Sequence, residues 1–340
     1  MSSMNGHRRP SLLSPINSLE GAERVVAAGA DEVYCEVTIP GLKNLVLYRN
    51  ALCNIQTYDE LDKVVSVCHK EGAKLILVAN FPFVSKRFEK QFAIHLSKCI
   101  DAGVDGLIVG NLGVLSMIKQ LGVNLPLYAS TFLCTMNYEA ANYLSELGFS
   151  RIILERHLSI EEISQIVKSS LAEIEVFIHG GGCSNINGSC YLLHRTLPEL
   201  LEALTRVEGF NPPCRLHFNV YDGQTGEFLK TTQILDAYVF CSLCRLPELM
   251  KIGVSGFKIV DRCLSARYQE TMTRIYRQII DLLEKGEIEA YEDALEAAKD
   301  IDMGLSPFFP QTIRKMCCEY QRCYYGPFYH VHRKVREVPG

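Results

Sequence analysis

The sequence contains no apolar run long enough to cross a membrane and no large excess of charge of either sign. Its 340 residues are 48% hydrophobic and 22% charged, and the formal net charge is −4. A chain so close to neutrality has no overall attraction to nucleic acid or to an anionic membrane, so neither is favoured as a partner. Arg8 and Arg9 are not followed by an apolar core of signal-peptide length. These absences predict a cytoplasmic protein of ordinary globular composition.

Three catalytic or binding motifs are also missing. The sequence has no HExxH, which would indicate a zinc protease, and no GxSxG nucleophile elbow. The first predicted strand is followed by SPINSLEG, where an open dinucleotide-binding sheet would carry its glycine fingerprint. These absences argue against the commonest hydrolase sites and against an open doubly wound sheet.

Cysteine is abundant, with fourteen residues in the chain. In a reducing compartment structural disulfides are rare, and clustered cysteines more often bind metal or take part in catalysis. Cys35, Cys68 and Cys99 lie in strand or helix patterns, so we expect these three to be core residues.

A strand–helix unit repeats along most of the chain. Short β-branched runs predict strands at Leu12–Ile16, Glu32–Val37, Lys74–Asn80, Gly106–Gly110, Leu125–Ser130, Arg151–Leu154, Ile174–His179 and Gly256–Asp261. Apolar residues at helical spacing predict helices at Leu19–Ala28, Tyr58–Glu71, Phe88–Ala102, up to about Leu121, Tyr138–Leu147, Ile160–Leu171 and Ala266–Lys285. Eight such units predict a (β/α)8 barrel over residues 11–285, and residues 286–340 form a C-terminal helix, Asp293–Ala298, and a tail.

In a barrel of this kind the active site lies at the carboxyl ends of the strands. The polar residues at these ends therefore form one predicted ring: Asn17, Glu36, Asn80, Asn111, Ser130, Glu155, Arg156, His179, Lys258, Asp261 and Arg262. Several of them must be structural, satisfying buried backbone groups or pairing with one another.

The repeat breaks between the seventh and eighth strands, from Gly180 to Val254. This insertion begins with HGGGCSNINGSC and carries Cys183, Cys190, Cys214, Cys241 and Cys244. Four thiolates suit either zinc or an iron–sulfur cluster, and the wide intervals between these cysteines suit a bulky cluster at least as well as zinc. The alternative for the first two is that they are buried and inert.

Three segments resemble the collagenase-like peptidase family, peptidase U thirty-two. HGGGCSNINGSC resembles its HGxxCxxxxGxC signature, NPPCRLHF its PCRWKY element, and CSLCRLPELMKIGVSGFKIVDR its segment around the last barrel strand. The resemblance implies a barrel with a [4Fe–4S] cluster held by Cys183, Cys190, Cys214 and Cys241, with Cys244 as the reserve ligand. Zinc is the alternative metal.

The family includes branches that hydroxylate quinone precursors or RNA bases without molecular oxygen and take the oxygen atom from prephenate. Two departures concern the substrate: the family's KIEGR reads KIVDR here, which places Val260 and Asp261 where the family has an acid and a glycine, and its APAG reads SPIN.

Three functions therefore compete: an iron–sulfur-dependent hydroxylase or oxidoreductase, a peptidase, and an iron–sulfur subunit that acts with a partner protein of the same family. For the first, we expect Asn80, Arg156 and His179 to be catalytic. Glu36, Lys258 and Arg262 are expected to bind a small molecule, possibly a carboxylate such as prephenate, because an arginine fork matches a carboxylate. Arg156 could instead pair with Glu36 or Glu155 inside the barrel.

The C-terminal tail interleaves aromatic and basic residues, a composition that can bind single-stranded nucleic acid. We favour the alternative that its aromatic residues pack on the barrel. Cys317, Cys318 and Cys323 could form a second metal or redox site.

Overall fold

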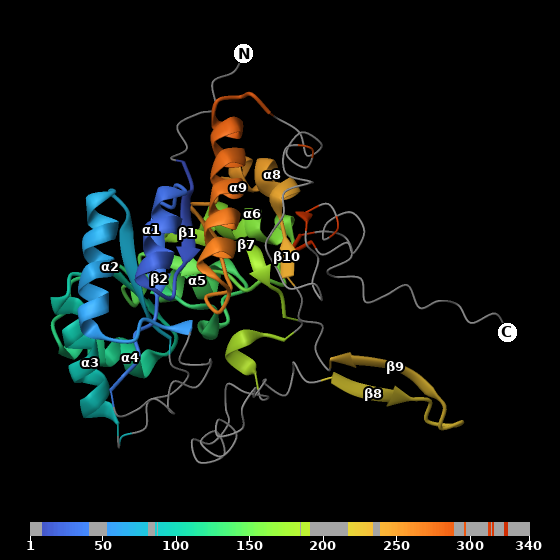
Figure 1. Cartoon of the computed structure of the whole chain (residues 1–340), viewed down its shortest axis with the longest axis horizontal. Helices are drawn as coiled ribbons and strands as arrows, with labels where there is room; N and C mark the ends of the chain where they lie inside the picture. Colours follow the sequence, from blue (N-terminus) through green and yellow to red (C-terminus); the bar gives the residue numbers. More distant parts are fainter. Residues whose placement is uncertain are drawn as a thin grey trace.

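The computed structural model describes residues 9–40, 53–80, 86, 88–183, 185–190, 217–233, 239–288, 296, 312, 313, 315 and 323–325. Eight parallel strands close into a barrel with helices around it (Figure 1). They are β1 (Ser11–Pro15), β2 (Glu32–Cys35), β3 (Lys74–Ala79), β4 (Gly106–Val109), β5 (Leu127–Ala129), β6 (Arg151–Ile153), β7 (Glu173–Gly181) and β11 (Gly256–Ile259). The predicted (β/α)8 barrel is confirmed.

The barrel closes because β11 pairs with both β7 and β1. Leu13 of β1 lies opposite Glu32 on one side and Lys258 on the other, and β7 also pairs with β6. The carboxyl ends of all eight strands therefore open at one rim, which we call the barrel mouth.

The outer layer consists of α1 (Leu19–Ala27), α2 (Tyr58–Lys70), α3 (Glu89–Asp101), α4 (Leu112–Gln120), α5 (Tyr138–Glu146), α6 (Ile160–Ser169) and α9 (Ala266–Glu284). Most begin at a side chain that caps the first backbone N–H groups; Ser159 and Glu162 form a full capping box on α6. The glycines predicted to end the helices, such as Gly29 and Gly72, have positive φ angles that favour glycine.

The insertion contains elements that the repeat did not predict. They are η3 (Asn187–Ser189), β8 (His217–Tyr221), β9 (Phe228–Gln233), β10 (Val239–Cys241), η5 (Leu243–Arg245) and α8 (Leu246–Lys251). Strands β8 and β9 form a hairpin that projects away from the barrel (Figure 1), and β10 pairs antiparallel with the end of β7. The predicted helix Asp293–Ala298, apart from Glu296, lies outside the described residues, as do Cys214, Cys317 and Cys318.

The amino-terminal half of the barrel interior is held by a buried ion network. Arg151, the first residue of β6, lies 2.6 Å from Glu32 and 3.2 Å from Glu175, and its guanidinium stacks over the ring of Tyr128. Burial is tolerated because the charges are paired and hydrogen-bonded. This network lies at the far end from the mouth, so we assign it to stability.

Candidate active site at the barrel mouth

The cysteine-bearing loop after β7 is fastened to the mouth by Asn187. Its backbone N–H donates to Glu155 Oε1 at 2.9 Å, and its side-chain amide donates to Thr131 of η2 (Thr131–Leu133) at 3.1 Å. At Gly188 a Cβ would collide with the carbonyl oxygen of Phe132 and with Cys134 Sγ, so only glycine allows this close approach. The sequence therefore places the loop over the ends of β5 and β6.

Two of the predicted thiol ligands accept hydrogen bonds from backbone N–H groups. Asn185 donates to Cys183 Sγ and Leu243 donates to Cys241 Sγ, both at 3.4 Å, and the Tyr276 hydroxyl also donates to Cys241 at 3.4 Å. Such donors stabilise a ligating thiolate. The chemistry of these two sulfurs therefore fits an iron–sulfur or zinc ligand set.

The described thiols do not assemble a metal site by themselves. Cys183 is half-buried, and Cys190 and Cys241 are buried. Within the described ranges no three Cys, His, Asp or Glu side chains come together as metal ligands. Cys214 lies outside these ranges, so the four-cysteine assignment stays a prediction.

Two further cysteines, Cys244 and Cys323, lie near Cys241. The backbones of Cys323 and Cys241 pair in an isolated parallel β-bridge. The N–H of the next residue, Tyr324, donates to the Cys241 carbonyl at 3.1 Å. A hydrogen bond with Cys323, together with burial, raises the pKa of Cys244. Thus Cys244, the reserve ligand, faces a cysteine of the C-terminal segment.

The structure does not place His179 at the mouth. Between Lys258 and Ile259 the register of β7 shifts by one residue, and a bulge of this kind redirects the side chain that follows it. His179 is fully buried between β7 and α9, where Tyr268 and Tyr276 lie 2.7 and 3.2 Å from its two ring nitrogens. The expected pocket-lining position of His179 is therefore corrected, because strand alternation cannot be read through a bulge.

Arg262 and Glu36 form an ion pair across the mouth. Arg262 Nη2 lies 2.7 Å from Glu36 Oε2, and both side chains are more than nine-tenths buried. The predicted alternative partner of Glu36, Arg156, is not the one observed. Arg262 Nη1 is buried and has no hydrogen-bond acceptor among the described residues.

Lys258 lies just below this pair. Its ammonium is 4.0 Å from the centre of the Tyr34 ring and 3.6 Å from Glu175 Oε1, and it makes no hydrogen bond to the part of the chain that the structure describes. Burial lowers the pKa of Lys258 to about 8, against the opposing effect of Glu175 and with a further lowering by Arg262. Buried donors without acceptors call for a ligand or an ordered water.

Arg156 and Asn80 complete the predicted set at the mouth. Arg156 stacks over Phe177 at 4.5 Å and donates to Asn187 Oδ1 at 3.1 Å. It thus links the barrel wall to the cysteine loop. Asn80 Oδ1 is buried without a partner in the described ranges, and a Cβ at Gly110 would collide with it. The observed position of the Asn80 side chain is therefore possible only because residue 110 is glycine.

Other members of the predicted ring are structural. Asn111 and Ser130 cap α4 and η2, and Asn17 donates to the carbonyl groups of Arg262 and Leu264. These residues satisfy backbone groups at the strand ends. Their proximity to the mouth explains why the sequence pattern could not separate them from binding residues.

Cys134 and Asp261 are the non-glycine residues with positive φ angles in the described chain, at 53° and 86°. Cys134 lies beside Gly188, and the Asp261 carboxylate lies where a Cβ on Gly180 would be. Asp261 occupies the position at which the family pattern has glycine. The positive φ of this position explains why the family has glycine there, since glycine adopts such a conformation without strain. Strained backbone on both sides of the cysteine loop is typical of functional sites.

The sequence reasoning missed Cys134, although TFLC follows the fifth strand directly and so had to lie at the mouth. It also missed Tyr268 and Tyr276. In the sequence these two tyrosines are aromatic residues eight positions apart on one long helix. This spacing is also typical of residues that simply pack in the core, so it does not indicate a functional role.

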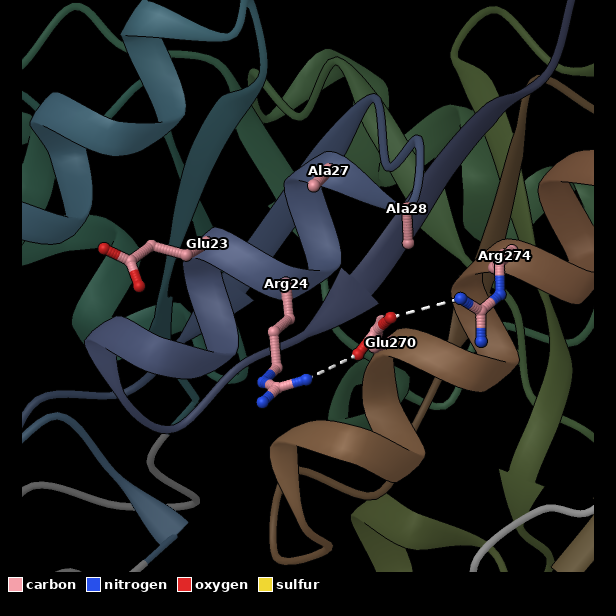
Figure 2. Close-up of a pocket in the computed structure, with 6 residues that line it drawn as sticks. All are labelled: Glu23, Arg24, Ala27, Ala28, Glu270 and Arg274. Carbon is pink, nitrogen blue, oxygen red and sulfur yellow. Dashed lines mark hydrogen bonds and ion pairs between the residues drawn. The ribbon is translucent and has the colours of Figure 1, made fainter.

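A hollow of about 300 Å³ lies elsewhere, between α1 and α9 on the outer helix layer. Figure 2 shows the residues that line it. Arg24 and Arg274 both pair with Glu270 there, at 3.0 and 3.2 Å. The hollow lies away from the strand ends and its charges are largely paired, so it does not compete with the mouth as a site.

These features define a (β/α)8 barrel with a cysteine-bearing loop over the carboxyl ends of its strands. The chain belongs to the peptidase family U32, whose model matches residues 17–316. None of the helices that the structure describes is long and apolar enough to cross a membrane.

Three relatives illustrate the range of the family. The chain is 29% identical over 282 residues to the 23S rRNA 5-hydroxycytidine C2501 synthase of Escherichia coli and 29% identical over 333 residues to the uncharacterized protease MJ0090 of Methanocaldococcus jannaschii. It is 27% identical over 289 residues to the tRNA hydroxylation protein P1 of Bacillus subtilis. The matches cover 82%, 94% and 82% of this chain but 41%, 72% and 65% of the relatives.

Proposed function

We propose that this chain is an iron–sulfur-dependent oxidoreductase that hydroxylates a ring compound or an RNA base without molecular oxygen. The cluster ligands would be Cys183, Cys190, Cys214 and Cys241. A [4Fe–4S] cluster would supply the electron transfer that oxygen-atom transfer requires. Two of the three relatives carry names that describe hydroxylation of RNA, which supports this class of reaction.

The observation that carries the proposal is the pair of unsatisfied donors in the barrel, Arg262 Nη1 and Lys258 Nζ. Glu36 neutralises Arg262, so the mouth presents hydrogen-bond donors more than free positive charge. A carboxylate accepts several hydrogen bonds at once and matches such donors. These two residues would bind a carboxylate oxygen donor such as prephenate, and Arg156 would hold the cysteine loop over it.

A peptidase is the second candidate, because one relative is named a protease. A cysteine peptidase built on Cys183 would need a base beside its thiol. His179, the nearest histidine in the sequence, has a tyrosine hydroxyl at each ring nitrogen and is held toward α9. This contact weighs against the dyad that the sequence left open.

The metal assignment is tested by purifying the protein without oxygen and measuring visible absorption and iron and zinc content. Alanine variants of Cys183, Cys190, Cys214 and Cys241 are each expected to lose the broad visible absorption. Cys68→Ala, a buried cysteine of α2, is the control that keeps it. Full iron in all four variants would refute the assignment, and full iron in Cys241→Ala alone would transfer the role to Cys244.

The reaction is tested by incubating cluster-loaded protein anaerobically with prephenate and candidate ring or RNA acceptors, and in parallel with gelatin. Oxygen incorporation that is lost in Arg262→Gln supports the proposal. Gelatin hydrolysis that survives removal of iron, without oxygen incorporation, would establish the peptidase instead.

A further inference from the structure

A disulfide joins two segments of the barrel mouth that are far apart in sequence. Cys53 and Cys263 are bonded, with their Cα atoms 4.5 Å apart and 210 residues between them in sequence. This Cα separation lies within the range that disulfides adopt. The fourteen cysteines led us to expect metal or catalysis rather than a cross-link, so the bond requires its own explanation.

The two cysteines lie in segments that are connected to the Glu36–Arg262 ion pair. Cys263 directly follows Arg262. Cys53 lies two residues before Ile55, which donates its N–H to the Glu36 carbonyl at 2.9 Å and accepts from Thr38 N at 2.8 Å. The cross-link therefore ties the segment that carries Arg262 to the segment that is hydrogen-bonded to the backbone at Glu36.

The bond is accessible on one side. Cys263 is exposed, whereas Cys53 is 4% exposed. Disulfide exchange begins with attack of an external thiolate on an accessible sulfur, here Cys263 Sγ. Next to Cys53, the buried side-chain amide of Asn54 has no hydrogen-bond partner among the described residues.

We propose that Cys53 and Cys263 form a reversible disulfide that holds Arg262 in position at the barrel mouth, so that reduction of this bond releases the arginine. An external dithiol would attack Cys263 Sγ, release the Cys53 thiolate and form a mixed disulfide. Its second thiol would then displace Cys263. The dithiol loses two electrons and two protons to become a disulfide, and the protein gains two thiols. The proposal does not depend on which reaction the barrel catalyses.

The first test asks whether the bond exists. Cells producing the full chain are quenched in acid, free thiols are alkylated, and the protein is digested without reductant. A linked peptide containing Cys53 and Cys263 is expected, and it should disappear after treatment with dithiothreitol. Cys35, Cys68 and Cys99 are buried in the core and serve as internal controls that are never cross-linked. Absence of the linked peptide from the quenched protein would overturn the proposal.

The second test measures the release of Arg262 without any substrate. The rate of its modification by phenylglyoxal, followed by peptide mass spectrometry, is expected to rise at least several-fold on reduction. Arg151, held by carboxylates at the other end of the barrel, should not change. Cys53→Ser/Cys263→Ser should show the fast rate with or without reductant, and the single variant Cys263→Ser, at an exposed position, provides the same measurement if the double variant folds poorly. Equal Arg262 rates in the oxidised and reduced wild type would refute the proposed control.

Discussion

Replacing Lys258 by methionine is expected to stabilise the protein at neutral pH. The Lys258 side chain is 7% exposed, and its ammonium has Tyr34 and Glu175 as neighbours but no hydrogen-bond acceptor in the described residues. Burial lowers its pKa from 10.5 to about 8. One pKa unit corresponds to about 1.4 kcal/mol, so holding this lysine charged in the folded state costs about 3 kcal/mol. Methionine has a similar length and carries no charge, and Arg151 still pairs with Glu175 in the variant.

The sign of the pH dependence follows from the direction of the shift. Between pH 8 and 10.5 the unfolded chain binds the lysine proton more strongly than the folded chain does. The free energy of unfolding of the wild type therefore rises with pH through this window. The advantage of Lys258→Met is largest below pH 8, at about 1 to 3 kcal/mol, and it disappears near pH 10.5.

Urea unfolding of the wild type and of Lys258→Met between pH 6.5 and 10.5 measures the difference in their free energies of unfolding. The effects of other titrating groups cancel in this difference. Lys98→Met is the matched control, since Lys98 also lies over a tyrosine ring, at 4.9 Å from the centre of Tyr58, but is exposed on α3. If Lys258→Met is less stable than the wild type at pH 7, or if the difference does not vary with pH, the reasoning is wrong. Prephenate binding should be lost in the same variant, which would explain why a destabilising lysine is present.

Three further perturbations test the mouth. Glu36→Gln should lower the free energy of unfolding by about 3 kcal/mol because it leaves Arg262 buried without its carboxylate. The double variant Glu36→Gln/Arg262→Gln should lose less stability than Glu36→Gln alone. Equal losses for the single and double variants in urea unfolding would contradict the pairing. The Cys53–Cys263 bond closes a loop of 210 residues, which corresponds to about 5 kcal/mol, so Cys53→Ser/Cys263→Ser should melt several degrees below the oxidised wild type and level with the reduced one. Asp261→Gly should be more stable than Asp261→Ala by about 1 kcal/mol because only glycine adopts the positive φ without strain, and identical melting temperatures would show that the backbone relaxes.

The sequence by itself determined the barrel. Apolar runs and helical spacing gave eight strand–helix units, and no strand or helix bound of the barrel differs from the structure by more than about two residues. Local signals were sufficient because each helix has an apolar face, and most helices also have a capping side chain at the start and a glycine just after the end. The hairpin β8–β9 was not predicted, although Asp222 and Gly223 mark its turn, because it lies in the insertion and outside the repeating strand–helix unit.

The candidate site was only partly determined by the sequence. From the predicted strand ends we expected Glu36, Arg156, Lys258 and Arg262 to lie near one another, because parallel strands share one rim. The structure places these four residues in the barrel interior or at its mouth. Which carboxylate pairs with which arginine depends on distances across the barrel, and no local pattern contains these.

Only the tertiary structure decided the orientation of His179 and the pairing of Cys53 with Cys263. A one-residue bulge reverses the face to which a strand residue points, and its position is set by the neighbouring strand rather than by the residues of β7. Similarly, two cysteines separated by 210 residues meet because closing the barrel brings the ends of β2 and β11 to the same rim. The sequence states which residue types are present, and the closure of the sheet determines which of them meet.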